Sequence, residues 1–394
     1  LHNMAITKVT TPVTDFDKAT SLPGLKIPSG DNSNQPAGAA AEQGMIRNDN
    51  EETVGSSASA IAHYNGTAWQ YFAATESALN FYNNLLWTGD GTNNRIITGL
   101  GFTPDFVWIK NRATNDSHQL FDSLRDENLL YSNGADQQFF IPDWEIINDG
   151  FDLGSAYPNG RNGNGNDIVG WCWKAGGAAV ANTDGNIASQ VSANAAGGFS
   201  IVKWSGNDTT GGTIGHGLSS TPELTIIKKT SATANWQVSL NASVTGVEGY
   251  MNLDASVALY TTYPLYYTSS NSTVLSSNGT STGTRLYNNQ SANYIAYCFH
   301  SVAGRSKIGS YTGTGAGTAV TTGFEPAFVM IKKTSGSADW IIFDNKRGSN
   351  ILKPNIYNSE VSLTNYITYN STGFTFPTSD SNINIGDFIF MSFA

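Results

Sequence analysis

The chain has 394 residues, of which 39% are hydrophobic and 11% aromatic, too many for a globally disordered protein. Its formal net charge of −10, without any run of Lys and Arg, excludes binding to a nucleic-acid backbone. No stretch approaches 18 consecutive apolar residues, so no membrane insertion is expected. Only 13% of residues are charged and 41 are glycine, which favours strands joined by turns over helices.

Residues 1–78 differ from the rest and are predicted to be a mostly extended leader that attaches to other proteins. Their apolar content is too small for a core of their own. One short hairpin is expected around residues 62–70, where Asn65-Gly66 supplies a tight turn. The first eight residues also lack the apolar core of a signal peptide.

The remaining sequence contains one pattern three times. Pro104, Pro222 and Pro326 each open a run of apolar and β-branched residues that ends in a lysine. Three further features accompany each run: an aromatic-hydroxyl-Gly triplet before it, and an aromatic strand and a closing strand after it. The triplets are Trp87-Thr88-Gly89, Trp204-Ser205-Gly206 and Tyr311-Thr312-Gly313, and the closing strands are residues 168–174, 294–300 and 388–394.

This repeat predicts an all-β chain of three tandem antiparallel sandwich or jelly-roll-like modules. Their predicted bounds are 79–180, 195–303 and 304–394. The small-residue stretch from Ala175 to Gly198 is expected to be a loose linker, whereas the short seam at 302–304 predicts rigid packing of modules two and three. Cys172 and Cys298 occupy equivalent positions in the closing strands and are predicted to be buried and unbridged.

The strand between the run and the closing strand carries an Asp-Arg pair in two modules. The pairs are Asp122 with Arg125 and Asp344 with Arg347, while module two has Leu240 and Ser243 instead. Their spacing predicts local salt bridges, with no catalytic role.

The Gly-Met-Ile-Arg-Asn stretch at 44–48, followed by Tyr64-Asn65-Gly66-Thr67-Ala68-Trp69, resembles an element of tailed-bacteriophage fibre proteins. The run from Gly101 to Arg112, with the closing strand Trp171-Cys172-Trp173, is similar to repeats in tail-fibre and structural proteins of marine phages, cyanophages among them. The resemblance implies a protein of the virion surface, assembled in the host cytoplasm and released by lysis.

Candidate contact residues lie outside the repeated landmarks. The run 159–167 (Asn-Gly-Arg-Asn-Gly-Asn-Gly-Asn-Asp) offers amides and one carboxylate, for which calcium binding and sugar recognition are both open, besides an ordinary turn. A sugar would stack on Tyr157 and bond to Asn159, Arg161, Asn162 and Asn164. The other candidates for an exposed contact surface are Trp144, Tyr263, Tyr266 and Tyr267. The repeated tryptophans (Trp87, Trp108, Trp171, Trp173, Trp204, Trp236 and Trp340) are instead predicted to pack in cores.

The first functional hypothesis is a non-catalytic tail fibre or adhesin that recognises a host surface, with a glycan as candidate ligand. It is expected to be a homo-oligomer, with a trimer favoured, and to bind other virion proteins through its leader. Two alternatives are a capsid decoration or head-fibre protein and a polysaccharide depolymerase. No metal site follows from the scattered histidines, and no catalytic motif is present.

Overall fold

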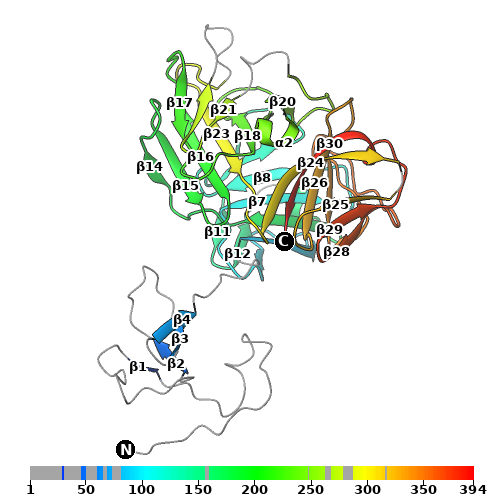
Figure 1. Cartoon of the computed structure of the whole chain (residues 1–394), viewed down its shortest axis with the longest axis horizontal. Coiled ribbons are helices and arrows are strands. Elements are labelled where there is room, and N and C mark those ends of the chain that lie inside the picture. The colour runs from blue at the N-terminus through cyan, green and yellow to red at the C-terminus, as the bar shows by residue number, and fades with distance from the viewer. Residues whose placement is uncertain are drawn as a thin grey trace, which may run out of the picture. The chain divides into compact units, whose positions relative to one another are not determined.

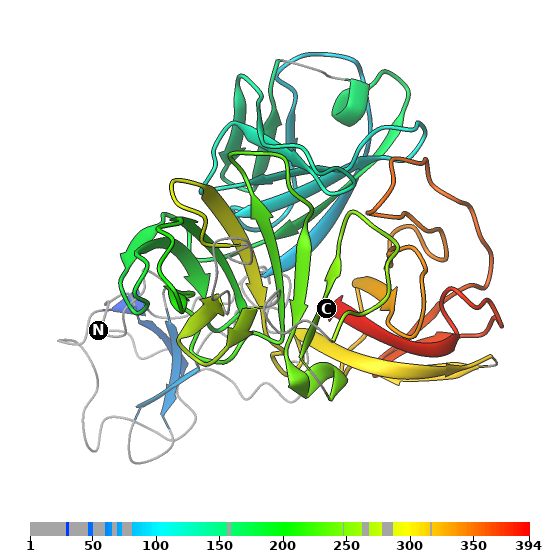
Figure 2. The ribbon, with the colours of Figure 1, turned by 90° about the horizontal axis from the view of Figure 1, so that it is seen from above.

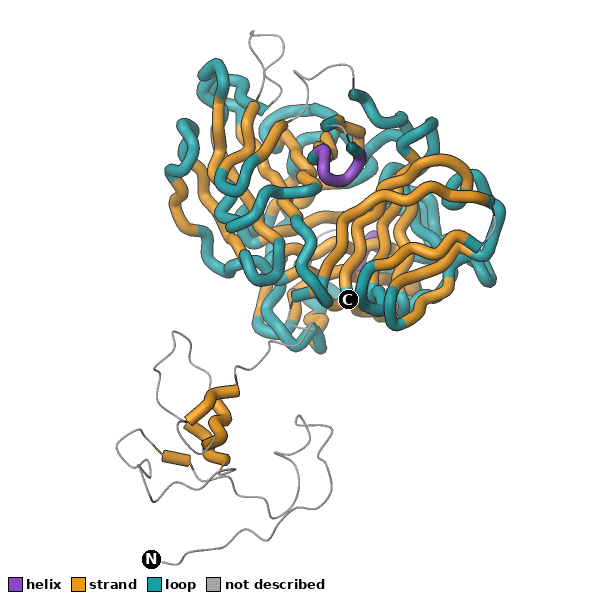
Figure 3. Tube along the Cα trace, viewed as in Figure 1, coloured by secondary structure: helices purple, strands orange, loops and turns teal. Residues whose placement is uncertain are grey.

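The computed structural model shows an all-β protein (Figure 1). It describes residues 81–155, 159–246, 248–261, 268–277, 287–315 and 317–394, together with the backbone of four strands before residue 73. Residues 1–77 and 78–394 are two separate compact units. Among the described residues the helices are two short ones, α1 (Asn159–Asn162) and α2 (Ala242–Thr245) (Figure 3).

The first unit contains one four-stranded sheet. Its order is β1 (Ser29–Gly30), β2 (Ile46–Asp49), β3 (Ala60–Tyr64) and β4 (Trp69–Phe72). Strands β3 and β4 pair antiparallel with Tyr64 opposite Trp69, which confirms the predicted hairpin. Its turn residues Asn65 and Gly66 lie outside the described residues.

The second unit contains the same larger sheet three times. In module one the order is β10 (Phe139–Phe140), β9 (Asn128–Tyr131), β8 (Gln119–Asp122), β7 (Phe106–Asn111), β13 (Asp167–Trp173) and β5 (Tyr82–Thr88). In module two it is β14 (Val180–Asn182), β15 (Ser189–Asn194), β16 (Phe199–Ser205), β23 (Asn293–Phe299), β18 (Leu224–Lys229), β19 (Gln237–Leu240) and β20 (Gly249–Asn252). In module three it is β24 (Ser306–Thr314), β30 (Ile385–Phe393), β26 (Phe328–Lys333) and β27 (Ile341–Asp344).

A three-stranded sheet covers one face of each larger sheet. These are β11 (Trp144–Ile147), β12 (Gly150–Leu153) and β6 (Ile96–Thr98); β17 (Gly212–Gly215), β22 (Val274–Ser277) and β21 (Thr268–Ser270); and β25 (Thr318–Thr321), β29 (Gly373–Phe376) and β28 (Thr368–Asn370). Each pair of sheets encloses its own buried apolar cluster, so each module is a sandwich.

The strand register confirms the repeat at single-residue precision. The three prolines each lie two residues before the equivalent strands β7, β18 and β26. The third residue after each proline is then opposite the same position of the closing strand: Val107 faces Cys172, Thr225 faces Cys298 and Val329 faces Ser392. Both cysteines are buried and free, as predicted.

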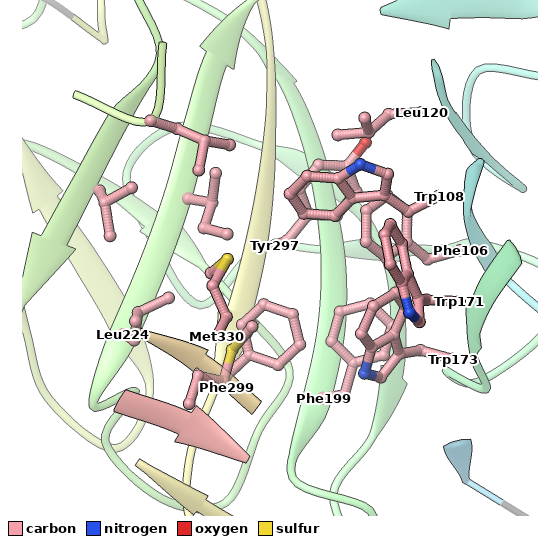
Figure 4. Close-up of a cluster of buried hydrophobic side chains, with 14 of the residues drawn as sticks. Phe106, Trp108, Leu120, Trp171, Trp173, Phe199, Leu224, Tyr297, Phe299 and Met330 are labelled. Carbon is pink, nitrogen blue, oxygen red and sulfur yellow. The ribbon is translucent and has the colours of Figure 1, made fainter. Parts of the chain in front are cut away.

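The three larger sheets lie around the middle of the second unit (Figure 2). Their other faces meet there at a central cluster of buried side chains, to which every module contributes (Figure 4). Its aromatic members are Tyr82, Phe106, Trp108, Trp171, Trp173, Phe199, Trp236, Tyr297, Phe299, Phe328, Trp340 and Phe393. Ring contacts join each pair of modules there. The centroid distances are 4.3 Å for Phe106–Tyr297, 5.5 Å for Trp173–Phe328 and 5.8 Å for Phe299–Phe393.

The two kinds of core explain why the repeated runs are apolar without alternation. In β7, Phe106 and Trp108 point into the central cluster, whereas Val107 and Ile109 point into the sandwich core. A strand that is buried on both faces is expected to be continuously apolar. Six of the seven repeated tryptophans are no more than 3% exposed and Trp87 is 9% exposed, which confirms their predicted packing role.

The modules follow one another head to tail around this cluster. The same main-chain hydrogen bond occurs at each of the three joints. Gln138 N–H donates to the Thr230 carbonyl, Leu259 N–H to the Thr334 carbonyl and Glu360 N–H to the Arg112 carbonyl, at 3.2, 3.3 and 2.9 Å. A heterologous contact that returns to its starting module closes a ring, here within one chain.

One expectation about the module seams is wrong. The stretch from Ala175 to Gly198 contains β14 and β15, which extend the larger sheet of module two, with Val191 opposite Val202. Val191 and Ile187 are buried in the sandwich core of module two. Because these residues are folded into that sheet, modules one and two share a core and lack the expected loose linker.

Candidate functional site

The run 159–167 forms a turn that is held from inside the molecule. The indole N–H of Trp87 donates to the Arg161 carbonyl at 3.1 Å. The Asn162 side-chain oxygen accepts from the Arg95 guanidinium at 3.0 Å, and its amide N–H₂ donates to the Thr92 carbonyl at 2.8 Å and to Asp90 at 2.7 Å. Asp90 also accepts from the Thr92 hydroxyl at 2.7 Å and from its backbone N–H at 2.9 Å, and these two bonds together with the one from Asn162 lower the pKa of the Asp90 carboxyl to about 2.

The bond from the triplet aromatic residue occurs in all three modules, and the asparagine bond to the loop after the triplet occurs in modules one and two. In module two, Trp204 donates to the Tyr287 carbonyl at 2.9 Å, and the Asn288 amide donates to the Thr209 carbonyl at 2.9 Å. In module three, the Tyr311 hydroxyl donates to the Ile383 carbonyl at 2.6 Å. The residue after Ile383 is Asn384, whose amide donates to the Phe376 and Thr378 carbonyls at 3.1 and 2.6 Å. The three asparagines are at most 1% exposed.

The calcium and sugar interpretations of Asn162 are therefore wrong. Its oxygen already faces an arginine, whose positive charge would repel a calcium ion, and its amide is consumed in internal bonds. A buried asparagine at the same place in all three modules is a structural residue.

This arrangement also explains the aromatic-hydroxyl-Gly triplet. Its hydroxyl bonds to the residue directly before the repeated closing segments 168–174, 294–300 and 388–394: Thr88 to Asp167, Ser205 to Asn293 and Thr312 to Asp387. A Cβ on its glycine would come within 2.3 Å of backbone atoms in each module, at Gly89, Gly206 and Gly313. The aromatic residue and the hydroxyl thus hold the turn before the closing strand by hydrogen bonds, and the glycine leaves room for its backbone.

The prediction that Arg161 is a surface contact is also wrong. Its side chain is fully buried, and its guanidinium donates to the Leu153 carbonyl at 2.5 Å and to the Gln119 side chain at 3.3 Å. Burial lowers its pKa to about 10. Asn164 is exposed, as a contact residue requires, whereas Tyr157 and the side chain of Asn159 lie outside the described residues.

The expectation that Trp144 lies on an exposed surface is wrong as well. It is 3% exposed and stacks on Phe121 at 3.6 Å and on Phe151 at 5.4 Å between ring centroids. Trp144 belongs to the smaller sheet of module one, whose inner face the sequence spacing did not reveal. Tyr263, Tyr266 and Tyr267 lie outside the described residues.

The two Asp-Arg pairs are salt bridges, as predicted, but both are buried. Arg125 Nε lies 2.6 Å from Asp122 Oδ2, and Arg347 Nε lies 2.5 Å from Asp344 Oδ2. Each also contacts the neighbouring module, through Tyr297 in the first case and Trp171 in the second. They act at the module joints.

One polar depression on module two remains as a candidate binding site. Its volume is about 490 Å³, and hydroxyl, amide, carboxylate and imidazole groups line it: Ser220, Thr221, Glu223, Asn241, Ser243, Ser270, Asn271, His300 and Ser301. Four separate segments converge there, including the start of α2. Sequence reasoning missed this site because its members are scattered over 80 residues.

His300, which is buried, and Glu223, which is half-buried, both bond to Ser301 in the lining of this depression. The Glu223 carboxylate accepts from the backbone N–H of Ser301 at 2.7 Å and from its hydroxyl at 2.5 Å. His300 Nδ1 faces the Ser301 carbonyl at 3.0 Å and therefore carries the proton in that bond. Its Nε2 atom is buried and has no hydrogen-bond partner among the described residues.

The chemistry of the depression suits a neutral polar ligand. It combines several acceptors and small hydroxyl groups, and its position at the surface allows water to mediate further bonds. Within the described residues, no group of three or more His, Cys, Asp or Glu side chains is placed to hold a metal ion. The helices of the same residues are too short to cross a membrane.

The comparisons with known proteins assign the second unit to a family. Residues 77–394 match a family described as a domain of unknown function (DUF7483), and the chain belongs to this family. The match covers all three modules as one continuous unit, in agreement with their shared central cluster. No curated protein matches the chain. No solved structure matches it either.

Proposed function

We propose that the protein is a non-catalytic component of a virion surface, a tail fibre or similar appendage that recognises or attaches to a host. The observation that carries this proposal is the closure of three sandwiches around one central cluster. It supports a rigid platform whose loops point outward, the usual arrangement for recognition on a stable scaffold. The resemblance of the repeated strands to phage structural proteins supports the same setting.

The ligand that the depression on module two favours is a neutral polyhydroxy compound, such as a sugar unit of a host-surface glycan. Side-chain amides, hydroxyls and a carboxylate are the groups that bond to sugar hydroxyls. In this proposal the leader, residues 1–78, binds other virion proteins, and the protein assembles as a trimer.

Binding of glycans to immobilised full-length protein tests this assignment. Ser243 is exposed at the rim of the depression, so Ser243→Trp is expected to fill it and to reduce binding of any retained glycan at least tenfold. The matched control is Ser362→Trp, an exposed serine in module three. Equal binding by both variants, or binding by neither the native protein nor the control, contradicts a glycan site here.

The pseudo-threefold ring favours one alternative, a capsid decoration or head-fibre protein. Three modules related by rotation can present equivalent surfaces to a threefold axis of a shell. Imaging of particles that carry the labelled protein distinguishes tail from capsid. The third hypothesis, a depolymerase, predicts new reducing ends when purified protein is incubated with host capsule.

A further inference from the structure

Besides the central cluster, one loop of each module contacts the next module. This loop follows the strand that carries the Asp-Arg pair, and it approaches the closing strand of the following module. The Tyr297 hydroxyl of module two donates to Asp122 Oδ2 of module one at 2.7 Å and lies 3.2 Å from Arg125 Nη2. Figure 4 shows Tyr297 beside Phe106 and Trp108 of module one.

The joint from module three to module one is built in the same way. The Trp171 indole N–H donates to Asp344 Oδ2 at 2.9 Å, and the Arg347 guanidinium lies over the Trp171 ring at 5.4 Å. Trp171 and Tyr297 are equivalent, because each immediately precedes the cysteine of its closing strand. A polar-tipped aromatic side chain thus faces an Asp-Arg pair at both joints.

The joint from module two to module three differs at all of these positions. Leu240 and Ser243 replace the Asp and Arg, and Met391 replaces the polar-tipped aromatic residue. Leu240 and Met391 are each 2% exposed and belong to the central cluster, and α2, which contains Ser243, packs against β24 of module three. The Asp-Arg pair is therefore absent at the one joint where the residue at the closing-strand position, Met391, has no N–H or O–H group to donate.

We propose that these pairings fix the order of the modules around the ring, each closing strand selecting its neighbour by chemistry. The alternative order places module three after module one and module one after module two. Asp122 and Arg125 would then face Met391, while Leu240 would face the indole of Trp171. Both contacts leave buried polar groups unpaired, and only the contact of Asp344 with Tyr297 stays matched.

One odd joint is enough for this selection, because a ring of three modules has only two cyclic orders. The native order satisfies all three joints, and the alternative order violates two. The interaction surface of modules one and two therefore accepts a polar loop, whereas that of module three accepts an apolar one. This explains why module two departs from the repeat at Leu240 and Ser243, a departure that its own sandwich core does not require.

A mutant cycle on the full-length protein tests the proposal. Tyr297→Met is expected to lower the melting temperature by roughly 2 to 4 °C, since it leaves Asp122 without its hydroxyl donor. Adding Asp122→Leu with Arg125→Ser copies the chemistry of the native apolar joint and is expected to recover part of that loss. Tyr294→Phe is the control, because that hydroxyl bonds to Asn289 within module two; it should show no coupling to the same loop changes.

The reciprocal cycle covers the case in which Tyr297→Met fails to fold. Met391→Tyr alone is expected to destabilise the protein, and addition of Leu240→Asp with Ser243→Arg to restore part of the loss. Recovery in either cycle supports the proposal. Purely additive losses, or equal coupling with the Tyr294→Phe control, overturn it.

Discussion

Some residues recur at the same position in every module because only that residue type fits the local structure. The triplet glycines are an example, because backbone of the turn before the closing strand occupies the space of a side chain. The buried lysines at the ends of the repeated runs are another. Lys110, Lys228 and Lys332 are fully buried and donate to main-chain carbonyls, two of them, Lys228 and Lys332, across a module joint.

Gly206→Ala tests the role of the triplet glycine. Its Cβ would lie 2.2 Å from the Asn289 carbonyl oxygen, so the turn must shift, and we expect a loss of about 2 kcal/mol or more in unfolding free energy. Gly336→Ala is the control, because its Cβ would meet no atom closer than 3.8 Å. Urea denaturation compares the two variants. Equal midpoints would show that the turn can move to accept the Cβ without a loss of stability, which contradicts the prediction.

Because of these buried lysines, we expect the free energy of unfolding to rise with pH between about 7.5 and 9. Burial lowers the pKa of Lys110, Lys228 and Lys332 to about 8, below the value of 10.5 in the unfolded chain. Above pH 8 the unfolded chain holds protons that the folded chain has released, so raising the pH favours folding, by roughly 2 kcal/mol over this window. Burial raises the pKa of Cys298 to about 12 and also raises that of Cys172, so both thiols oppose the trend increasingly as the pH approaches 9 and passes it.

Urea midpoints measured at several pH values check this dependence. Replacing all three lysines with methionine should flatten the rise, since methionine fills similar space without a titrating group. A midpoint that falls steadily from pH 7.5 to 9 in the native protein would contradict the lowered pKa values of the three buried lysines.

At the scale of elements, the residue after the repeated proline positions the chain that leaves the module in modules one and two, where it is a carboxylate, whereas module three has Ala327 there. Asp105 accepts from the backbone N–H groups of Ala175 at 2.8 Å and Gly177 at 3.3 Å, just after closing strand β13. Glu223 plays the same part for Ser301 in module two. A carboxylate at this position thus fixes the direction of the connecting segment.

Asp105→Ala is therefore expected to loosen residues 174–179 without unfolding the ring. Limited proteolysis should cut the variant in this segment at least several-fold faster than the native protein. Glu325→Ala changes an exposed carboxylate in the corresponding loop of module three and serves as the control. An unchanged cleavage rate in the Asp105 variant would show that β14 and β15, and not Asp105, hold residues 174–179 in place.

The sequence allows the three modules and their register to be predicted, because strands with a fixed place in a sandwich repeat their apolar pattern. It does not reveal that the larger sheets are buried on both faces, since a continuous apolar run is also typical of a single deep core. The strands β14 and β15 were missed because small residues such as Ala and Gly in 175–198 indicate a linker by composition alone. Trp144 and Arg161 were misassigned because burial by a distant sheet leaves no local signal.

At the scale of the whole molecule, the second unit, residues 78–394, forms a ring that one non-covalent joint closes. That joint joins module three to module one, and Glu360 is its centre, with Arg112 at 2.8 Å and Arg347 at 2.7 Å. The three modules share their largest apolar cluster, so removing one module would expose the other two. We therefore expect them to fold and unfold together.

Hydrogen exchange of the full-length protein through a urea transition tests this claim most directly. Peptides that cover the equivalent strands β7, β18 and β26 report on the three modules separately, because their amides lie in the centre of each larger sheet. A ring with one central cluster predicts that all three lose protection at the same urea concentration. Three distinct midpoints, or one module that opens while the others stay protected, would contradict it.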